Sequence, residues 1–173
     1  MTIRKIITYP DPVLRRKAEP VTEFDESLKQ LATDLAETMY DAPGAGLAAN
    51  QIGVCRQIVI IDVSKNKEEK KHLVLVNPEI IEKEGCQLDE EGCLSVIDLT
   101  ANVERYSKLL VRSQDLDGKV WEFQAEDFFA RVIQHEIDHL RGILFVDHLS
   151  TLKRSLYKRR LKKLLRDKER ESA

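Results

Sequence analysis

The first half of the chain carries one helical pattern of apolar residues, followed by short apolar runs. Apolar residues recur at three- and four-residue spacing between Asp25, which can cap a helix, and Pro43-Gly44, which end it. The apolar stripe of this predicted helix consists of Leu28, Leu31, Leu35 and Met39. Residues 58–61 and 73–76 are aliphatic runs bounded by polar residues, which indicates buried strands with a charged loop over 64–71.

The second half continues with strand patterns and ends with two helical ones. Strands are predicted at 80–81 and over 102–113, and the turn 115–118 leads into another strand at 120–123. A helix is predicted to start at Glu126 or Asp127 and to stop at Gly142. Its apolar face consists of Phe129, Val132, Ile133, Ile137 and Leu140.

A last helix is predicted from about Ser150, with leucines set among many lysines and arginines. We expect one stripe of this helix to be buried while the other stays strongly positive. The order of one helix, many strands and two helices predicts an α+β fold. In it, antiparallel β-sheets pack around a central helix, the one that starts at Glu126 or Asp127, with an N-terminal and a C-terminal helix beside them. Neither a linker nor an internal repeat is visible, so we expect a single domain over 1–173, with 150–173 as its basic C-terminal helix.

Composition narrows the class of protein. A chain of 173 residues buries roughly 70% of its unfolded surface, which is enough for a core of its own. The formal net charge of −2 argues against general nucleic-acid binding. Three cysteines cannot all pair with one another, and neither a signal segment nor a long apolar run is visible. We therefore expect a protein of the reducing cytoplasm that binds no membrane, with Cys55 and Cys86 as small buried hydrophobic residues.

The strongest chemical signal is the sequence His-Glu-Ile-Asp-His at 135–139. On a helix, His135 and His139 lie on one face, one turn apart, where they can share a metal ion. Glu136 can then reach a water molecule bound to that ion, which is typical of a metal hydrolase. Catalytic zinc sites have three protein ligands and an open position, so a third ligand must come from elsewhere.

Candidates for the third ligand lie on both sides of this motif. The metzincin pattern requires a histidine where this chain has Phe145, and His148, three residues further on, is expected to be an ordinary histidine. Glu169 and Glu171 lie in the charged tail and are poor candidates. Cys93 is the better candidate because a thiolate is a strong ligand for zinc or ferrous iron.

Three motifs in this order resemble those of the peptide deformylases. They are GAGLAANQ at 44–51, EGCLS at 91–95 and QHEIDHL at 134–140, and the resemblance extends to YPDPVL at 9–14. It implies removal of the formyl group from N-formylmethionine at the start of new bacterial polypeptides, which releases formate. After Ser95 the family most often continues with an aliphatic residue, proline and glycine, whereas this chain has Val-Ile-Asp at 96–98. We therefore expect a different loop on that side of the substrate groove.

The resemblance also implies roles for individual residues. One divalent metal ion is held by Cys93, His135 and His139, and it is ferrous iron in vivo, with zinc or nickel possible. Glu136 takes a proton from water and hands it to the departing amine. The Gln51 side-chain amide and the Leu94 backbone N–H stabilise the developing oxyanion.

We further expect a substrate groove beside the metal. The resemblance implies backbone hydrogen bonds from Gly46 to the substrate. Phe128 and Val132 lie one to two turns before the first histidine, and with Ala45 they are expected to form the methionine pocket. Asp138 is expected to support the site without binding the metal.

Alternatives remain open on sequence alone. A zinc endopeptidase would carry the same two-histidine motif, and a ribosome-binding protein could use the metal for structure only. The resemblance implies two partners, N-formylmethionyl nascent peptides and the ribosome, and the basic C-terminal helix is expected to contact the ribosome. The protein itself is expected to be a monomer. A solvated helix that aids solubility accounts for the basic tail equally well.

Overall fold

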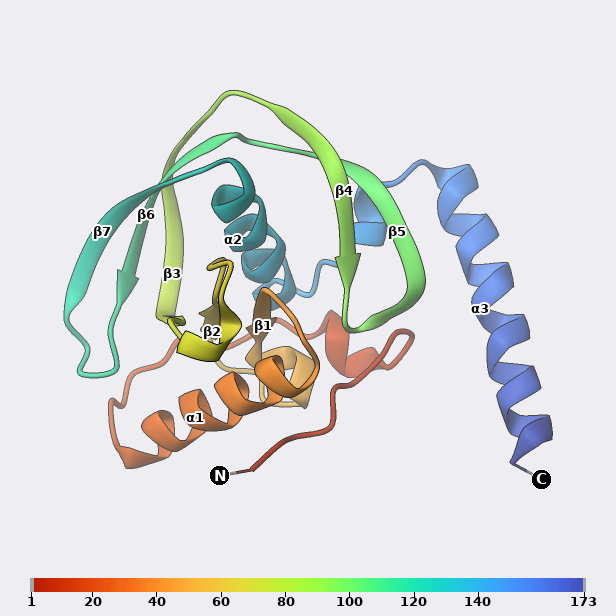
Figure 1. Cartoon of the computed structure of the whole chain (residues 1–173), viewed down its shortest axis with the longest axis horizontal. Coiled ribbons are helices and arrows are strands. Elements are labelled where there is room, and N and C mark those ends of the chain that lie inside the picture. Colours follow the sequence, from red (N-terminus) through yellow and green to blue (C-terminus); the bar gives the residue numbers. More distant parts are fainter. Residues whose placement is uncertain (1, 173) are drawn as a thin grey trace.

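In the computed structural model, which describes residues 2–172, a curved antiparallel sheet surrounds a central helix, α2 (Figure 1). The helices are α1 (Glu26–Asp41), α2 (Asp127–Leu140) and α3 (Thr151–Glu171). The strands are β1 (Gly46–Ala48), β2 (Ile58–Ile61), β3 (Leu73–Glu84), β4 (Gln87–Cys93), β5 (Val96–Arg105), β6 (Lys108–Gln114) and β7 (Val120–Glu126). The predicted α+β fold, with helices near both ends, is confirmed.

Helix α1 forms where its pattern predicted it. The Asp25 side chain accepts a hydrogen bond from the Leu28 backbone N–H at 3.1 Å, which caps the first turn. Leu28, Leu35 and Met39 are fully buried against β1 and β2. The apolar stripe therefore fixes the orientation of α1 under the sheet.

The main sheet has the order β1-β2-β3-β6-β7, and all its pairs are antiparallel. β3 joins the two separately predicted runs at 73–76 and 80–81 into one strand. Its register with β6 shifts after Val76, where Asn77 has φ 49° and Pro78 follows. In a sequence, a proline inside an apolar run predicts the end of a strand, but a strand tolerates a proline at a bulge.

A separate two-stranded sheet, β4–β5, lies on the other side of α2 from β6 and β7 (Figure 1). The predicted strand stretch 102–113 divides at Tyr106-Ser107 into β5 and β6, and β4 was not predicted. Glu91 is the one buried residue of β4, so that strand has no apolar run to reveal it. Strand β4 ends at Cys93, so the hairpin brings this cysteine over α2.

Helix α2 is the buried centre of the protein. Its bounds agree with the prediction, and Gly142 follows with φ 75°, as a helix-ending glycine does. Every residue from 130 to 137 is buried, including the polar side chains of Arg131, Gln134, His135 and Glu136. Buried polar side chains need partners, and those of α2 find them mostly in the β4–β5 hairpin.

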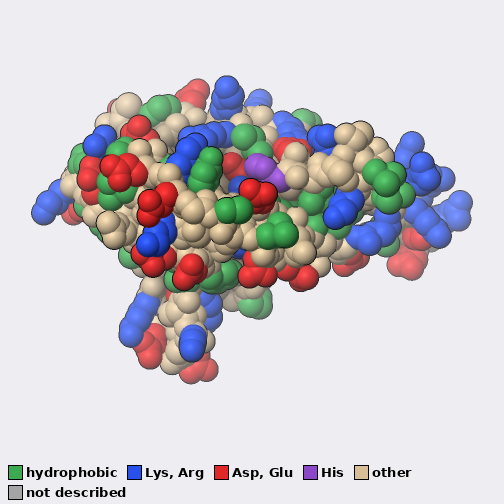
Figure 2. Space-filling model, turned by 90° about the horizontal axis from the view of Figure 1, so that it is seen from above, with side chains coloured by type: hydrophobic (Ala, Val, Ile, Leu, Met, Phe, Trp, Pro, Cys, Tyr) green, Lys and Arg blue, Asp and Glu red, His purple; other side chains and the backbone are tan. Residues whose placement is uncertain are grey.

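Helix α3 differs from its prediction. It stands beside the β4–β5 hairpin at one edge of the molecule, and only Tyr157 and Leu161 are buried. Leu152 and Leu156 are 69% and 52% exposed, so the expected buried stripe is short. Figure 2 shows Lys and Arg side chains crowding the end of the molecule where α3 lies. None of the helices within 2–172 combines the length and apolar character needed to cross a bilayer.

The prediction for the two other cysteines was also partly wrong. Cys86 is exposed and donates a hydrogen bond to Glu104, and Cys55 is half-buried. Cys86 follows Gly85 in the connection between β3 and β4, where a small side chain need not be buried.

Candidate metal centre and active site

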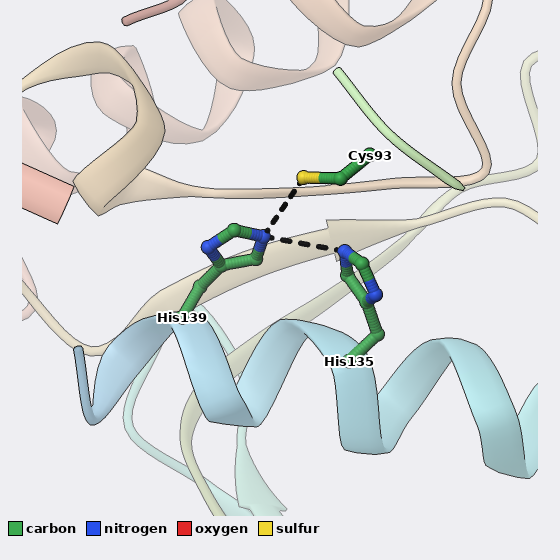
Figure 3. Close-up of side chains that lie close together, drawn as sticks. All are labelled: Cys93, His135 and His139. Atoms are coloured by element: carbon green, nitrogen blue, oxygen red, sulfur yellow. Dashed lines mark hydrogen bonds between the residues drawn. The ribbon is translucent and has the colours of Figure 1, made fainter. Parts of the chain in front are cut away.

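Cys93, His135 and His139 lie together, as expected from the sequence (Figure 3). Cys93 is at the end of β4, and both histidines project from one face of α2. The distance from Cys93 Sγ to His139 Nε2 is 3.3 Å, and that between the two Nε2 atoms is 3.2 Å. All three potential ligand atoms lie within 4.8 Å of one another.

These separations fit one shared metal ion. Tetrahedral bonds of the usual length to zinc place two nitrogens about 3.3 Å apart, and a nitrogen and a sulfur about 3.6 Å apart. His139 Nδ1 is buried without a hydrogen-bond partner in the described chain, and burial lowers the pKa of His139 well below its usual value. The unprotonated imidazole is the form that binds a metal. The cluster comprises three groups in the described residues, so a tetrahedral ion keeps a position for water.

Glu136 lies next to this cluster in a buried position. It is 4% exposed, and burial raises the pKa of its carboxyl to about 7. Glu136 Oε2 has no hydrogen-bond partner in the part of the chain that the structure describes. A carboxyl with a pKa near neutral pH and a free oxygen can both accept and return a proton.

Gly46 allows β1 to pass close to Glu136. A Cβ atom at Gly46 would lie 2.7 Å from Glu136 Oε1 and 2.8 Å from its Cγ, closer than real Cβ atoms come. β1 is an edge strand of the main sheet, so its side away from β2 is free of strand partners. Glycine at this point lets the edge of β1 and the Glu136 carboxylate face the same space.

Gln51 is held in one orientation by three hydrogen bonds. Its Oε1 accepts from the Ala48 N–H at 2.9 Å, and its Nε2 donates to Ser95 Oγ at 3.0 Å. Nε2 also lies 3.7 Å from Cys93 Sγ. The amide N–H group therefore faces the cysteine. Ser95, as the acceptor that holds this amide, was missed by sequence reasoning, although it stands in the second motif.

One cavity of about 540 Å³ brings most of the predicted residues together. Its wall contains Ala45, Gly46, Gln51, Cys93, Leu94, Phe128, Val132, His135 and Glu136. Val132 is buried in the wall, whereas Phe128 is 56% exposed. His139 is outside the lining and is only 1% exposed.

The unusual segment after Ser95 also reaches this cavity. Val96, Asp98, Leu99 and Thr100 line it, and Asp98 has φ 55°. Glu90 lines the same cavity from the neighbouring strand. The departure in the sequence therefore falls on the groove and leaves the Cys–His–His cluster unchanged.

A buried ion cluster supports the site from behind. Glu91 accepts hydrogen bonds from Arg105, from Arg131 and from His135 Nδ1, the last at 2.9 Å. Burial raises the pKa of Glu91, but hydrogen bonds from Arg105 and His135 outweigh it and lower the pKa to about 2. Asp138 accepts from Arg105 at 2.7 Å and lies 2.8 Å from the half-exposed His148. Asp138 thus lies outside the metal cluster, while the roles of Glu91, Arg105 and Arg131 were missed because they depend on contacts between distant elements.

Comparisons with known proteins agree with this geometry. The family model described as "Polypeptide deformylase" matches residues 3–155. A peptide deformylase of Desulfotalea psychrophila is 56% identical over 164 residues, which is 94% of this chain and 97% of that protein. One of Acidobacterium capsulatum is 51% identical over 166 residues, covering 96% of this chain and 98% of that protein.

Solved structures agree as well. The crystal structure of a peptide deformylase from Legionella pneumophila superposes with a TM-score of 0.90 at 48% identity, covering 98% of this chain and 99% of that chain. That of the enzyme from Plasmodium falciparum has a TM-score of 0.86 at 34% identity, covering 98% and 99% of the two chains. With its metal-binding motifs converging on one cavity and relatives of this similarity along nearly its whole length, the chain belongs to the peptide deformylase family and removes the N-formyl group from nascent polypeptides.

Proposed function

We propose that Cys93, His135 and His139 hold one divalent metal ion and that Glu136 moves the proton during hydrolysis of the formyl group. The carrying observation is that the three potential ligand atoms lie within 4.8 Å of one another and that Glu136 lines the same cavity as Cys93 and His135. A thiolate with two imidazoles suits ferrous iron, zinc or nickel, and we propose ferrous iron in vivo. The ion, when bound, polarises water and lowers its pKa from 15.7 towards about 7.

Glu136 accepts the proton that water loses as its oxygen attacks the formyl carbon. The carbon–nitrogen bond then breaks, and Glu136 returns the proton to the leaving nitrogen, which departs as a free amine. The formyl group leaves as formate. The carboxyl suits both steps because its pKa is raised to about 7 by burial, close to the pH at which the proton moves.

Gln51 and Leu94 stabilise the charge that develops on the formyl oxygen. The Gln51 amide is held by Ala48 and Ser95 with its N–H group beside Cys93, so it is positioned before the substrate arrives. Leu94 follows Cys93 directly, which puts its backbone N–H next to the same point. Removal of one such donor costs about 3 to 4 kcal/mol of barrier in other enzymes.

The substrate binds as an extended strand along β1. The free edge of β1 offers backbone groups of Gly46 for pairing, and strand addition to a sheet edge is a common mode of peptide recognition. The methionine side chain enters the part of the cavity lined by Ala45, Phe128 and Val132. Exposed Phe128 is then covered by the substrate.

Helix α3 contacts the ribosome, and the enzyme works as a monomer in the cytoplasm. Basic side chains surround a shallow depression on α3, namely Arg159, Arg160, Lys163, Arg166 and Arg170. Phosphate contacts by such side chains release counterions, so binding should weaken steeply with salt. The test is co-sedimentation with ribosomes, measured with and without residues 150–173 at two salt concentrations. If the ribosome-bound fraction of the protein depends neither on these residues nor on salt, the proposed contact is contradicted.

The experiment for the active site is formate release by anaerobically prepared protein whose metal content is measured. A formylated methionyl peptide should release formate, and an unformylated one should not be cleaved, whereas a zinc endopeptidase would cut internal bonds. Cys93→Ser should lose bound metal and activity together, and Cys86→Ser, at the exposed cysteine, serves as the matched control. Full activity and metal content in Cys93→Ser would contradict the ligand assignment.

A further inference from the structure

The proposed metal ligands come from two separate structural units, a β-hairpin and a helix. Cys93 belongs to the β4–β5 hairpin, whereas His135 and His139 belong to α2. Any movement of the hairpin relative to α2 therefore changes the distance from the cysteine to both histidines. The contacts between these two units decide whether the three ligands fit a metal.

A buried ion cluster makes that connection. Glu91, two residues before Cys93, accepts hydrogen bonds from Arg105 Nε at 2.8 Å and Nη2 at 2.9 Å. Arg105 also reaches α2 through Asp138 at 2.7 Å. Glu91 in turn accepts from His135 Nδ1 at 2.9 Å, so the hairpin and the metal-binding imidazole share one carboxylate.

Arg131 connects the same two units, but its side chain comes from α2 and reaches the hairpin. It lies on α2, four residues before His135 and therefore one turn earlier on the same face. Its Nη1 donates to Glu91 and, at 2.8 Å, to the carbonyl oxygen of Val103 on β5. Its Nη2 donates to the carbonyl oxygen of Gln87, at the start of β4, at 3.3 Å. One buried guanidinium thus binds both strands of the hairpin.

The hydrogen bonding of Arg131 indicates that it does more than fill space. Its Nε is buried without an acceptor among residues 2–172, a cost that an apolar side chain of similar size would avoid. Arg105 is shared between Glu91 and Asp138, so Arg131 supplies a second positive charge to the buried cluster. Arg131 also connects α2 rigidly to the hairpin, because its donors reach both strands.

Resting on the metal site proposed above, we propose that Arg131 is a positioning residue that sets the spacing between Cys93 and the two histidines and aligns the Glu91 carboxylate on His135. Partners that orient metal ligands typically change metal affinity by about 10- to 100-fold when they are removed. Arg131 lines the cavity beside Phe128 and Val132 and contributes to metal affinity in this way, without belonging to the Cys–His–His cluster.

The test is Arg131→Met, which keeps an unbranched side chain as far as the position of Nε and removes all the donors. Zn²⁺ dissociation constants are measured by chelator competition, and the Co²⁺-loaded protein is examined for its thiolate charge-transfer and d–d absorption bands. We expect the dissociation constant to rise at least about fivefold and the bands to shift. Arg112→Met, which removes an exposed arginine that pairs with Glu122, is the matched control and should change neither.

The outcomes are distinguishable. A dissociation constant raised less than about fivefold, or an unshifted Co²⁺ spectrum, overturns the role of Arg131 even where the melting temperature falls. Arg131→Lys, which keeps the charge and loses the fork of donors, decides by the same threshold if Arg131→Met does not fold. Failure of the unaltered protein to bind Zn²⁺ or Co²⁺ at all would instead overturn the proposed metal site.

Discussion

Gly46→Ala should damage catalysis without removing the metal. The added Cβ would lie 2.7 Å from Glu136 Oε1, 2.8 Å from Cγ and 3.0 Å from Cδ. Ordinary contact begins at 3.4 Å, so the carboxyl group must move by 3.4 − 2.7, or about 0.7 Å. Cγ is also too close, and it is tied to the α2 backbone, so a simple rotation of the carboxylate does not relieve the overlap.

A misplacement of about 1 Å can cost a catalytic group about 100-fold in rate, so we expect kcat to fall by about 10- to 100-fold. KM should change little, because the Gly46 backbone remains. The assay is formate release at saturating formylated peptide, together with metal analysis of the same sample. Normal metal content is expected because the three atoms nearest to the added Cβ all belong to Glu136.

Gly44→Ala is the matched control in the same loop. Its Cβ would lie 2.9 Å from Leu94 Cδ1, which is the end of a flexible side chain that can rotate away. This variant should keep kcat within about threefold of the unaltered enzyme. If Gly46→Ala retains kcat equally well with full metal content, the close approach of Gly46 to Glu136 does not control the reaction.

Three further perturbations follow from the same contacts. Glu136→Gln should lower kcat by about 100- to 10,000-fold with metal content unchanged, and a kcat within about tenfold of normal would rule out Glu136 as the proton carrier. Gln51→Leu should lose most turnover and, because it leaves the buried Ala48 N–H without an acceptor, about 1 to 3 kcal/mol of the free energy of unfolding in urea; near-normal turnover would refute its oxyanion role. Asp62 is buried, which raises its pKa, but hydrogen bonds from Ser64 and Tyr40 outweigh burial and lower the pKa to about 2. Because the folded pKa lies below the unfolded one, Asp62 stabilises the fold fully above about pH 4 and loses this effect as pH falls through 2. Asp62→Asn should therefore cost about 2 kcal/mol at pH 7 and about half as much at pH 3, and an equal cost at both would contradict this assignment.

The helices could be predicted because their signals are local. The Asp25 cap, the Gly142 stop and the three- to four-residue apolar spacing act within a few turns of backbone. The strand predictions were less accurate. Pro78 interrupts the apolar pattern in the sequence, whereas in the structure β3 continues through it because the strand has a bulge there. β4 was not predicted because it pairs with β5 and buries only Glu91.

The chemistry of the site was largely readable from residue types and spacing. His135 and His139 one turn apart on α2 predicted a shared ion, and Cys93, the predicted third ligand, lies beside them in the fold. Glu136 followed from its place between the histidines. These predictions depend on helical geometry and ligand chemistry, which can be deduced from residues close together in the sequence.

The tertiary structure decided what distant residues do to one another. It brought Glu91, Arg105 and Arg131 together behind the metal site, exposed Cys86, and left most leucines of α3 in solvent. An arginine in a sequence has no signature that distinguishes a solvated side chain from one buried against a carboxylate 40 residues away. Helical spacing and ligand type can be read along the chain, whereas burial and ion pairing depend on which elements pack together, and only the folded arrangement of α2 and the β4–β5 hairpin determines them.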